Sequence, residues 1–339
     1  MKNILVTGGA GFIGSNFIRH ILSSREDLRI VNLDKLTYAG NLENLRDVET
    51  HSNYEFVLGD ITNSAQVAEI FSKYDFNYVI NFAAETHVDR SILGSEDFVK
   101  TNILGAQVLL DNSLNHKIEK YVQISTDEVY GSLGETGLFS EKTPLSPNSP
   151  YSASKTSADL LVRSYYKTHG FPAMITRCSN NYGPYQFPEK LIPLMIINAM
   201  NDKNLPVYGD GKNVRDWIYV LDHNKAVEKV LEFGVPGEVY NIGASQEMQN
   251  IEIIKLILKE LGKPESLIQY VKDRPGHDRR YAIDSSKIQN QLGWTPESKF
   301  EEAIIETINW YKSNKSWWER IISGDYLEYY KKNYNSKTL

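Results

Sequence analysis

Two adjacent carboxylates follow an apolar run in the middle of the chain. Residues 121–124 predict a strand, and the sequence then continues Ser-Thr-Asp-Glu through Glu128. Burying unpaired charge beside a strand is costly, so this pair is a poor choice for packing. It suits a reaction in which Asp127 and Glu128 divide the work, one donating a proton and the other accepting one. A solvated loop explains the run equally well when it is taken alone.

Tyr151 and Lys155 open a helical pattern, and their spacing puts both side chains on one helix face. A lysine ammonium beside a phenol favours the phenolate, so Lys155 is expected to lower the pKa of Tyr151 from its usual value of about 10. Such a phenol could accept an alcohol proton near neutral pH. A bare Tyr-x-x-x-Lys is common on ordinary helices, and its interpretation therefore depends on the rest of the chain.

The N-terminus has the pattern of a dinucleotide-binding loop. A short apolar run at 3–7 leads into Gly8, Gly11 and Gly14, and a helical pattern follows. Glycines let the backbone approach a pyrophosphate, while the helix N-terminus offers free N–H groups and a positive dipole end. Strand before and helix after are the context that this fingerprint requires.

An acidic residue completes the fingerprint. The next predicted strand, 29–33, ends at Asp34, which lies 20 residues after Gly14. A carboxylate there can bind the adenosine ribose hydroxyls and would repel a 2′-phosphate. The pattern therefore favours NAD over NADP, and the neighbouring Lys35 weakens that preference only slightly.

These residues need a scaffold that brings strand ends together. Strands and helices alternate in the first half of the chain: strands are predicted at 3–7, 29–33, 54–58, 78–82, 120–125 and 172–176, and helices at 14–24, 64–73, 96–115 and 152–169. This alternation predicts an α/β fold with a doubly wound parallel sheet of the Rossmann type. Ligands bind in such sheets at the carboxyl ends of the strands.

Composition narrows the function classes. The chain has 339 residues and 38.7 kDa, which favours about two domains, and its net charge of −6 argues against a nucleic-acid partner. Its one cysteine, Cys178, follows an apolar run and is expected to be buried; it forms no internal disulfide and fits a cytoplasmic protein. No Cys/His spacing predicts a metal site. No run approaches the ~20 apolar residues of a membrane span, and no signal peptide is expected.

Taken together, the motifs resemble those of the extended short-chain dehydrogenase/reductase family, and within it those of the dTDP-glucose 4,6-dehydratases. The similarity extends over nearly the whole chain and is concentrated in the stretches 7–15, 34–42, 81–91, 125–131, 151–155, 179–191 and 273–281. Asp127 is the deciding residue, because related sugar-nucleotide epimerases and decarboxylases carry other residues between Ser/Thr and Val-Tyr-Gly.

The resemblance implies dehydration of dTDP-glucose to the 4-keto-6-deoxy sugar nucleotide, with NAD as cofactor. It gives Tyr151 and Lys155 the oxidation at C4, with Thr126 bonded to the same hydroxyl. Glu128 would remove the C5 proton, and Asp127 would protonate the departing 6-hydroxyl. The product would supply deoxysugar synthesis, for example of dTDP-rhamnose for cell-surface polysaccharide.

The resemblance also implies two sets of binding residues. The cofactor contacts are expected at Gly8, Gly11, Phe12, Ile13, Gly14, Asp34, Lys35, Leu36, Thr37, Asp60, Ile61, Phe82, Ala83, Ala84, Thr86, Thr101, Tyr151, Lys155 and Asn181. The substrate contacts are expected at Thr86, His87, Thr126, Asn180, Glu189, Lys190, Leu191, Pro206, Val207, Tyr208, Arg215, Asn250, Asp273, Arg274 and His277. For His87 a structural role is the alternative, and for Arg215 and Arg274 the alternative is a surface salt bridge.

The domain division and assembly are likewise implied by the family. An NAD-binding domain is expected at 1–179 with a return segment at about 217–243, and a nucleotide-sugar-binding domain at 180–216 and 244–339. The apolar faces of helices 96–115 and 152–169 would pair two chains in a four-helix bundle, although a monomer remains an alternative.

Proteins with several other functions share this fold. They are a UDP-glucose 4-epimerase, a UDP-glucuronate decarboxylase, a GDP-mannose 4,6-dehydratase, which should favour NADP, and a non-catalytic NAD-sensing protein. The epimerase and decarboxylase chemistries need no acid at C6, so Asp127 speaks against both. Asp34 speaks against the third, and the presence of both Tyr151 and Lys155 against the last.

Overall fold

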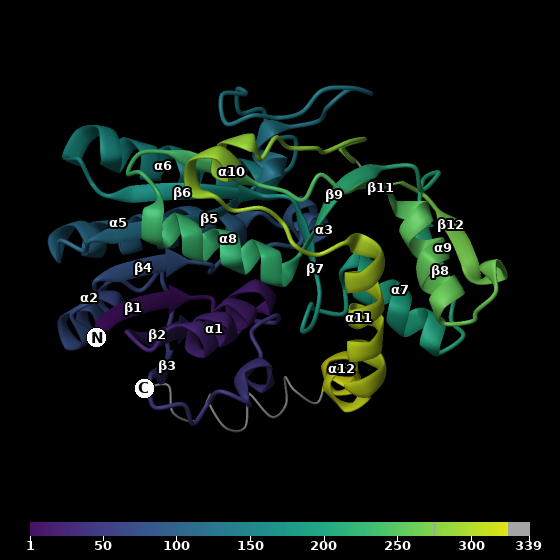
Figure 1. Ribbon diagram of the computed structural model, residues 1–339, viewed down its shortest axis with the longest axis horizontal. Helices are drawn as coiled ribbons and strands as arrows, with labels where there is room; N and C mark the ends of the chain where they lie inside the picture. Colours follow the sequence, from purple (N-terminus) through teal and green to yellow (C-terminus); the bar gives the residue numbers. More distant parts are fainter. Residues whose placement is uncertain (274–275, 325–339) are drawn as a thin grey trace.

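A seven-stranded parallel sheet forms the centre of the computed structural model, which describes residues 1–273 and 276–324 (Figure 1). The strand order is β10-β6-β5-β4-β1-β2-β3, so the direction of winding reverses between β1 and β4. The strands are β1 (Lys2–Thr7), β2 (Leu28–Asp34), β3 (Tyr54–Leu58), β4 (Tyr78–Asn81), β5 (Lys120–Thr126), β6 (Ala173–Cys178) and β10 (Val239–Ile242). The predicted doubly wound fold is confirmed.

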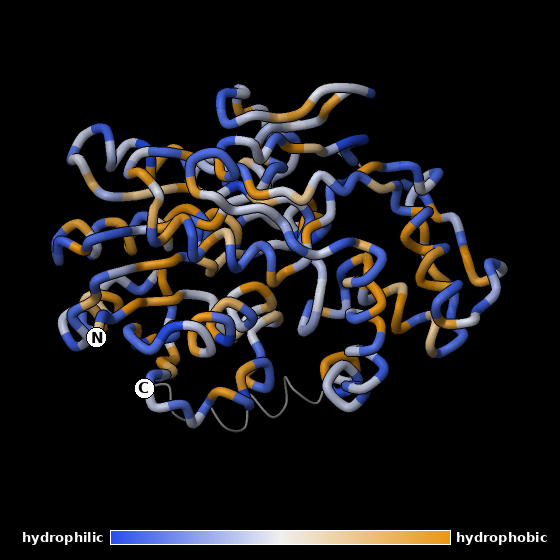
Figure 2. The backbone as a smooth tube through the Cα atoms, in the orientation of Figure 1, coloured by the Kyte–Doolittle hydropathy of each residue, from blue (hydrophilic) through white to orange (hydrophobic). Residues whose placement is uncertain are grey.

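The inner strands are continuous apolar runs because helices cover both faces of the sheet. Ile4, Leu5 and Val6 of β1 are fully buried, and they divide between the two hydrophobic clusters that flank the sheet. One face is covered by α1 (Phe12–Ser24), α8 (Val220–Phe233) and α10 (Ser286–Leu292), and the other by α2 (Ser64–Tyr74), α5 (Ala106–Asn115) and α6 (Pro150–His169). Figure 2 shows the apolar residues gathered along these contacts.

The predicted helix at 96–115 is more irregular than its sequence suggests. It consists of α4 (Glu96–Phe98), a π-helical turn η2 (Val99–Gly105) and α5. Asn102 lies in this wider turn, and its side chain donates to Glu85 O over 3.0 Å and to Ser154 Oγ over 2.8 Å. Single π-turns inside helices are frequent at functional sites.

Helix α6 has clear local signals at both ends. The Ser149 hydroxyl accepts the Ser152 amide over 3.0 Å, and Pro150 occupies the first turn, where its missing N–H costs nothing. Gly170 ends the helix with a φ of 63°, a left-handed conformation that glycine adopts without strain. These caps fix the start of the helix that carries Tyr151 and Lys155.

Segments from the second half of the chain build a smaller layer, called the second layer below, beside the central sheet (Figure 1). β7 (Asn180–Tyr182), β9 (Val214–Tyr219) and β11 (Glu247–Gln249) form one sheet, and β8 (Leu205–Tyr208) pairs with β12 (Ile268–Val271). The helices α7 (Leu191–Met200), α9 (Asn250–Glu260), α11 (Phe300–Ser313) and α12 (Lys315–Ser323) share a hydrophobic cluster of their own. The short elements are η1 (Leu42–Leu45), α3 (Val88–Leu93), η3 (Asp127–Tyr130) and η4 (Glu265–Leu267). None of the helices described here is both long and apolar enough to cross a membrane.

Candidate active site

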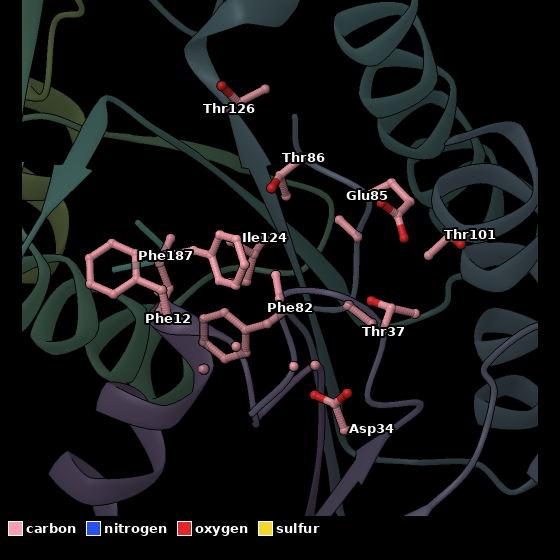
Figure 3. A pocket seen from close by; sticks show the side chains of 18 of the residues that line it. Phe12, Asp34, Thr37, Phe82, Glu85, Thr86, Thr101, Ile124, Thr126 and Phe187 are labelled. Atoms are coloured by element: carbon pink, nitrogen blue, oxygen red, sulfur yellow. The ribbon is translucent and has the colours of Figure 1, made fainter. Parts of the chain in front are cut away.

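The carboxyl ends of β1, β2, β4 and β5 open onto a cavity of about 310 Å³. Figure 3 shows Asp34 and Thr126 at opposite ends of this cavity, with the aromatic rings of Phe12, Phe82 and Phe187 along one side. The cavity lies where the winding of the sheet reverses, which is the usual ligand position in open α/β sheets.

The turn from β1 to α1 depends on close backbone approach. Gly8 has a φ of 69°, and a Cβ there would lie 2.6 Å from Ala83 N. A Cβ at Gly14 would lie 2.5 Å from Gly8 O. Gly11 precedes α1 without a side-chain cap, so the first-turn amides are available to an anion in the cavity. This turn fits the pyrophosphate of a dinucleotide.

Asp34 ends β2 and is already tied to the backbone. Its two carboxylate oxygens accept the amides of Ala10 and Leu36, each over 2.8 Å. Burial raises the pKa of Asp34, while these two amide bonds oppose the rise. Each oxygen keeps a second lone pair for a hydroxyl donor. Lys35 lies 2.6 Å from Asp60 Oδ2 through its Nζ.

All but one of the expected cofactor residues line the cavity. Those beyond the glycine turn and Asp34 are Lys35, Thr37, Asp60, Ile61, Phe82, Ala83, Ala84, Thr86, Thr101, Tyr151, Lys155 and Asn181. Leu36 differs, because its side chain is buried in the hydrophobic core and only its backbone serves the site.

Thr126 organises the predicted catalytic run. It is the last residue of β5, and its Oγ1 accepts the Glu128 amide over 3.2 Å at the start of η3. The same hydroxyl donates to Asp127 Oδ1 over 3.2 Å. Thr126 and Glu128 line the cavity together with Tyr151 and Lys155.

Asp127 is the most perturbed carboxyl group of the site. It is 2% exposed, and its Oδ2 has no hydrogen-bond partner among the described residues. Burial, followed by the charges of Glu128 and Asp216, holds the pKa of Asp127 well above its ordinary value, while Arg215 opposes them. A carboxyl group in such surroundings stays protonated and can act as an acid.

The expected effect of Lys155 on Tyr151 is wrong in this geometry. Burial raises the pKa of Tyr151 well above its ordinary value, and the nearby Glu128 adds to the rise. Lys155 is itself buried, which lowers the pKa of its ammonium, and its Nζ donates to Ile124 O over 2.7 Å. Desolvation of the phenol therefore outweighs the stabilisation that the helix spacing alone predicts.

The expected substrate residues divide between the cavity and its surroundings. Thr86, Asn180, Glu189 and Lys190 line the cavity, as does Thr126. His87 caps α3 instead, because its Nδ1 accepts the Arg90 amide over 3.4 Å, and its Nε2 lies 3.7 Å from Glu189 Oε2. Burial lowers the pKa of His87, so the imidazole serves this cap in its neutral form.

Arg215 lies on β9 and is buried rather than paired at the surface. Its guanidinium donates to Asp278 O over 2.9 Å and lies 4.3 Å from the centre of the Tyr281 ring. His277 Nδ1 lies 2.6 Å from Asp273 Oδ1. The remaining expected residues are placed outside the cavity lining: Leu191 begins α7, Pro206, Val207 and Tyr208 lie on β8, and Asn250 begins α9. Arg274 lies outside the described residues.

Twelve cavity residues were not among the expected contacts, and five of them bring polar or aromatic side chains from segments outside the strands. These five are Tyr38, Glu85, Ser179, Gln186 and Phe187. The Tyr38 and Phe187 rings meet edge-on at 5.4 Å, and the Arg90 guanidinium covers Tyr38 at 3.8 Å. All five fall inside stretches that carry the resemblance, so their position after a strand end was the available signal. No group of His, Cys, Asp and Glu within 1–273 and 276–324 could hold a metal ion.

Comparison with known proteins identifies the family to which the chain belongs. A family model described as GDP-mannose 4,6 dehydratase matches residues 5–307. A dTDP-glucose 4,6-dehydratase of Escherichia coli is 50% identical over 352 residues, which cover 95% of this chain and 97% of that protein. The chain belongs to the dTDP-glucose 4,6-dehydratase family.

Solved structures of this family have the same fold. The Bacillus anthracis dTDP-glucose 4,6-dehydratase in complex with NAD is 51% identical, with a TM-score of 0.90 and coverage of 95% of this chain and 100% of that one. The Streptomyces venezuelae enzyme with NAD and TYD bound is 45% identical, with a TM-score of 0.92 and coverage of 94% and 99%. The site is therefore compared with the active sites of the dehydratases rather than with those of the epimerases considered above.

Proposed function

We propose that this protein is an NAD-dependent hydro-lyase that converts dTDP-glucose to dTDP-4-keto-6-deoxy-glucose. The observation that carries the proposal is the buried Asp127, whose raised pKa favours its protonated form, directly beside Glu128, which lines the cavity together with Tyr151. Asp127 itself lies just behind the cavity lining. Loss of the 6-hydroxyl as water needs an acid at that oxygen and a base at C5. Epimerisation at C4 and decarboxylation need no acid at the C6 oxygen.

The cofactor site is supported by the fit of the residues present. The turn at Gly8–Gly14 with the start of α1 would hold the pyrophosphate, and Asp34 would hold the adenosine ribose. When bound, NAD would accept hydride from C4 of the sugar and return it to C6, so that no external reductant would be needed.

The oxidation step depends on Tyr151, Lys155 and Thr126. Tyr151 takes the proton of the sugar 4-hydroxyl as that carbon is oxidised, and Thr126 hydrogen-bonds the same oxygen. Tyr151 can accept this proton only after releasing its own to solvent, and burial opposes the phenolate by raising the pKa of Tyr151. The positive charge of Lys155 would stabilise the phenolate against this cost. Lys155, fixed on Ile124 O, holds positive charge at the base of the cavity and orients the nicotinamide ribose.

The elimination step uses the two carboxyl groups in opposite senses. The new 4-keto group acidifies the C5 proton, and Glu128 removes it. The C5–H electron pair forms the C5–C6 double bond, the C6–O bond breaks, and Asp127 gives its proton to the departing oxygen, which leaves as water. Glu128 later returns a proton to C5 as C6 is reduced.

Substrate specificity is assigned to residues on the second layer. Arg215, Asn250 and His277 would hold the diphosphate and deoxyribose, as would Arg274, which lies outside the described residues. Lys190, Leu191 and the residues of β8 would border the thymine. A buried guanidinium such as that of Arg215 suits diphosphate because its planar donors bind oxygens in pairs. The division into an NAD-binding and a nucleotide-sugar-binding domain is supported by the separate hydrophobic cluster of the second layer. Ile288 and Trp294, which the sequence assigned to the second domain, pack instead in the cluster beside the central sheet.

Assembly as a homodimer belongs to the same proposal. Val99, Leu104 and Leu160 expose 51%, 44% and 52% of their surface on neighbouring helices, η2 and α6. Two such faces packed together would give the four-helix bundle. A cytoplasmic location and a place in deoxysugar synthesis, for example of rhamnose, are part of the proposal.

One assay tests the activity. The purified protein is incubated with dTDP-glucose without added reductant, and alkali is added to develop the ultraviolet chromophore of a 4-keto sugar. UDP-glucose serves as the comparison substrate. Conversion of UDP-glucose to UDP-galactose with dTDP-glucose inert would identify an epimerase instead.

A further inference from the structure

Ala10, between the glycines of the dinucleotide turn, is held through both its backbone N–H and its backbone carbonyl. Its N–H donates to Asp34 Oδ2 over 2.8 Å. Its carbonyl oxygen accepts the Asn41 amide over 3.0 Å and the Asn44 side-chain amide over 2.9 Å. Ala10 is fully buried, so these partners fix the two peptide planes that meet at Ala10 in the turn. Two of them come from the segment after β2.

Asn44 is in turn held by a residue from the far end of the chain. Its Oδ1 accepts the Trp317 indole N–H over 2.9 Å, and both side chains are buried. Trp317 lies on α12, 273 residues later in the sequence. A continuous path of hydrogen bonds therefore runs from Trp317 through Asn44 and Ala10 to Asp34.

The chemistry of the groups allows only one orientation of the Asn44 amide. An indole N–H can only donate and a backbone carbonyl can only accept, so Oδ1 must face Trp317 and Nδ2 must face Ala10. Without the indole donor, the buried Oδ1 of Asn44 has no partner, and this orientation of the side-chain amide is no longer favoured.

Trp317 is itself rigidly placed. Its ring lies 5.0 Å from that of Trp310 and 6.0 Å from that of Tyr185, centre to centre. The neighbouring Tyr311 hydroxyl donates to Gln186 O, and Gln186 lines the cavity. Tyr311 on α11 thus contacts a cavity residue directly, whereas Trp317 on α12 reaches the glycine turn through Asn44.

We propose that Trp317 is a positioning residue for NAD binding, acting through Asn44 to fix the Ala10 carbonyl and the glycine turn. The inference rests on NAD as the cofactor in the proposed function but concerns binding rather than turnover. The competing explanation is that Trp317 only packs α12 in place.

Trp318 provides the matched control. It is buried on the same helix, and its indole N–H donates to Tyr311 O over 2.9 Å, within the second layer of the molecule. Trp317→Phe and Trp318→Phe therefore remove one buried indole donor each, but only the first removes a donor on the path to Ala10.

The test titrates NAD into NAD-free protein by calorimetry, with a parallel titration of thymidine diphosphate. Trp317→Phe should weaken NAD binding about tenfold, while Trp318→Phe changes it by less than about twofold. Thymidine diphosphate should bind all three proteins alike. Unchanged NAD affinity in Trp317→Phe, or equal weakening in both variants, would refute the role. Neither titration needs turnover, so a failure of the proposed activity would be seen separately.

A second variant keeps the test decisive if Trp317→Phe does not fold. Asn44→Leu has nearly the same shape as the native residue, but it can neither accept the indole N–H nor donate to Ala10 O. It should weaken NAD binding by at least about tenfold, and adding Trp317→Phe should then change the affinity by less than about twofold, because neighbours on one path are not additive. Wild-type affinity in Asn44→Leu would overturn the proposal.

Discussion

Asp127 and Glu128 are consecutive residues in unlike surroundings. Asp127 is buried with one carboxylate oxygen lacking any partner among the described residues, whereas Glu128 lines the cavity. The Thr126 hydroxyl contacts both residues, because it donates to Asp127 Oδ1 and accepts the Glu128 amide, both over 3.2 Å. Environment thus distinguishes two carboxyl groups that the sequence alone shows as equal.

Tyr151→Phe should abolish the first oxidation. Without the phenol oxygen, nothing in that position accepts the 4-hydroxyl proton, so no bound NADH should appear when substrate is added. Absorbance at the reduced-nicotinamide band measures this directly. Tyr165→Phe is the matched control, since Tyr165 lies on the same helix and its hydroxyl donates to Asp111. NADH formation in Tyr151→Phe would assign the base to another group.

Glu128→Gln should suppress exchange at C5. An amide cannot accept the C5 proton, but Tyr151 and Lys155 remain, so bound NADH should still form. Mass spectrometry of the sugar nucleotide in deuterated water follows the exchange. Deuterium uptake at C5 at the wild-type rate would remove Glu128 from the role of base.

NAD should bind at least tenfold more tightly than NADP, a difference of about 1.4 kcal/mol. Asp34 lies at one end of the cavity, where it would meet the 2′-phosphate, and Lys35 is held 2.6 Å from Asp60 Oδ2. Titration of cofactor-free protein with each nucleotide measures the preference. Equal affinities would show that cations near the cavity compensate for Asp34.

The sequence predicted the parts of the site that local rules determine. Glycine spacing, the acid at the end of β2 and the alternation of strands and helices follow from backbone geometry, and all of these are confirmed by the fold. Cys178 is buried as expected, and burial raises its pKa to about 12.

What the sequence could not predict depends on packing between distant segments. The pKa of Tyr151 is governed by desolvation, which no spacing along a helix reveals. The capping role of His87 depends on where α3 begins, and Leu36 turns inward with a φ of 55°. The bond between Trp317 and Asn44 joins segments 273 residues apart. These features follow from tertiary contacts.

The rate of water loss should depend on pH through the protonation of Asp127. Its protonated form is the active one and its pKa is raised, so elimination should be fast below that pKa and slow as pH rises through it. Asp216 contributes to the rise, and its own pKa is about 6. Asp216→Asn removes this charge and should move the descending limb to lower pH.

Single-turnover elimination measured across pH tests this shift. Asp222→Asn is the control, because Asp222 is also buried but accepts the Ser298 amide over 2.9 Å and is not among the charges that shift the Asp127 pKa. A limb that stays in place in Asp216→Asn would exclude Asp216 from setting the acidity of Asp127.

Asp127→Asn separates water loss from the steps before it. The amide is isosteric with the acid and keeps the Thr126 contact, but it has no acidic proton to give to the departing hydroxyl. Oxidation at C4 and exchange at C5 should therefore continue, while elimination slows by about 10²–10⁴-fold, the usual contribution of general acid catalysis. Rapid-quench mass spectrometry in deuterated water, combined with the reduced-nicotinamide absorbance, resolves the three steps. Bound NADH and C5-deuterated dTDP-sugar should accumulate before product appears. Elimination at the wild-type rate would mean that the buried carboxyl group of Asp127 is not the acid, and that the protonation of the leaving oxygen belongs to another residue or to solvent.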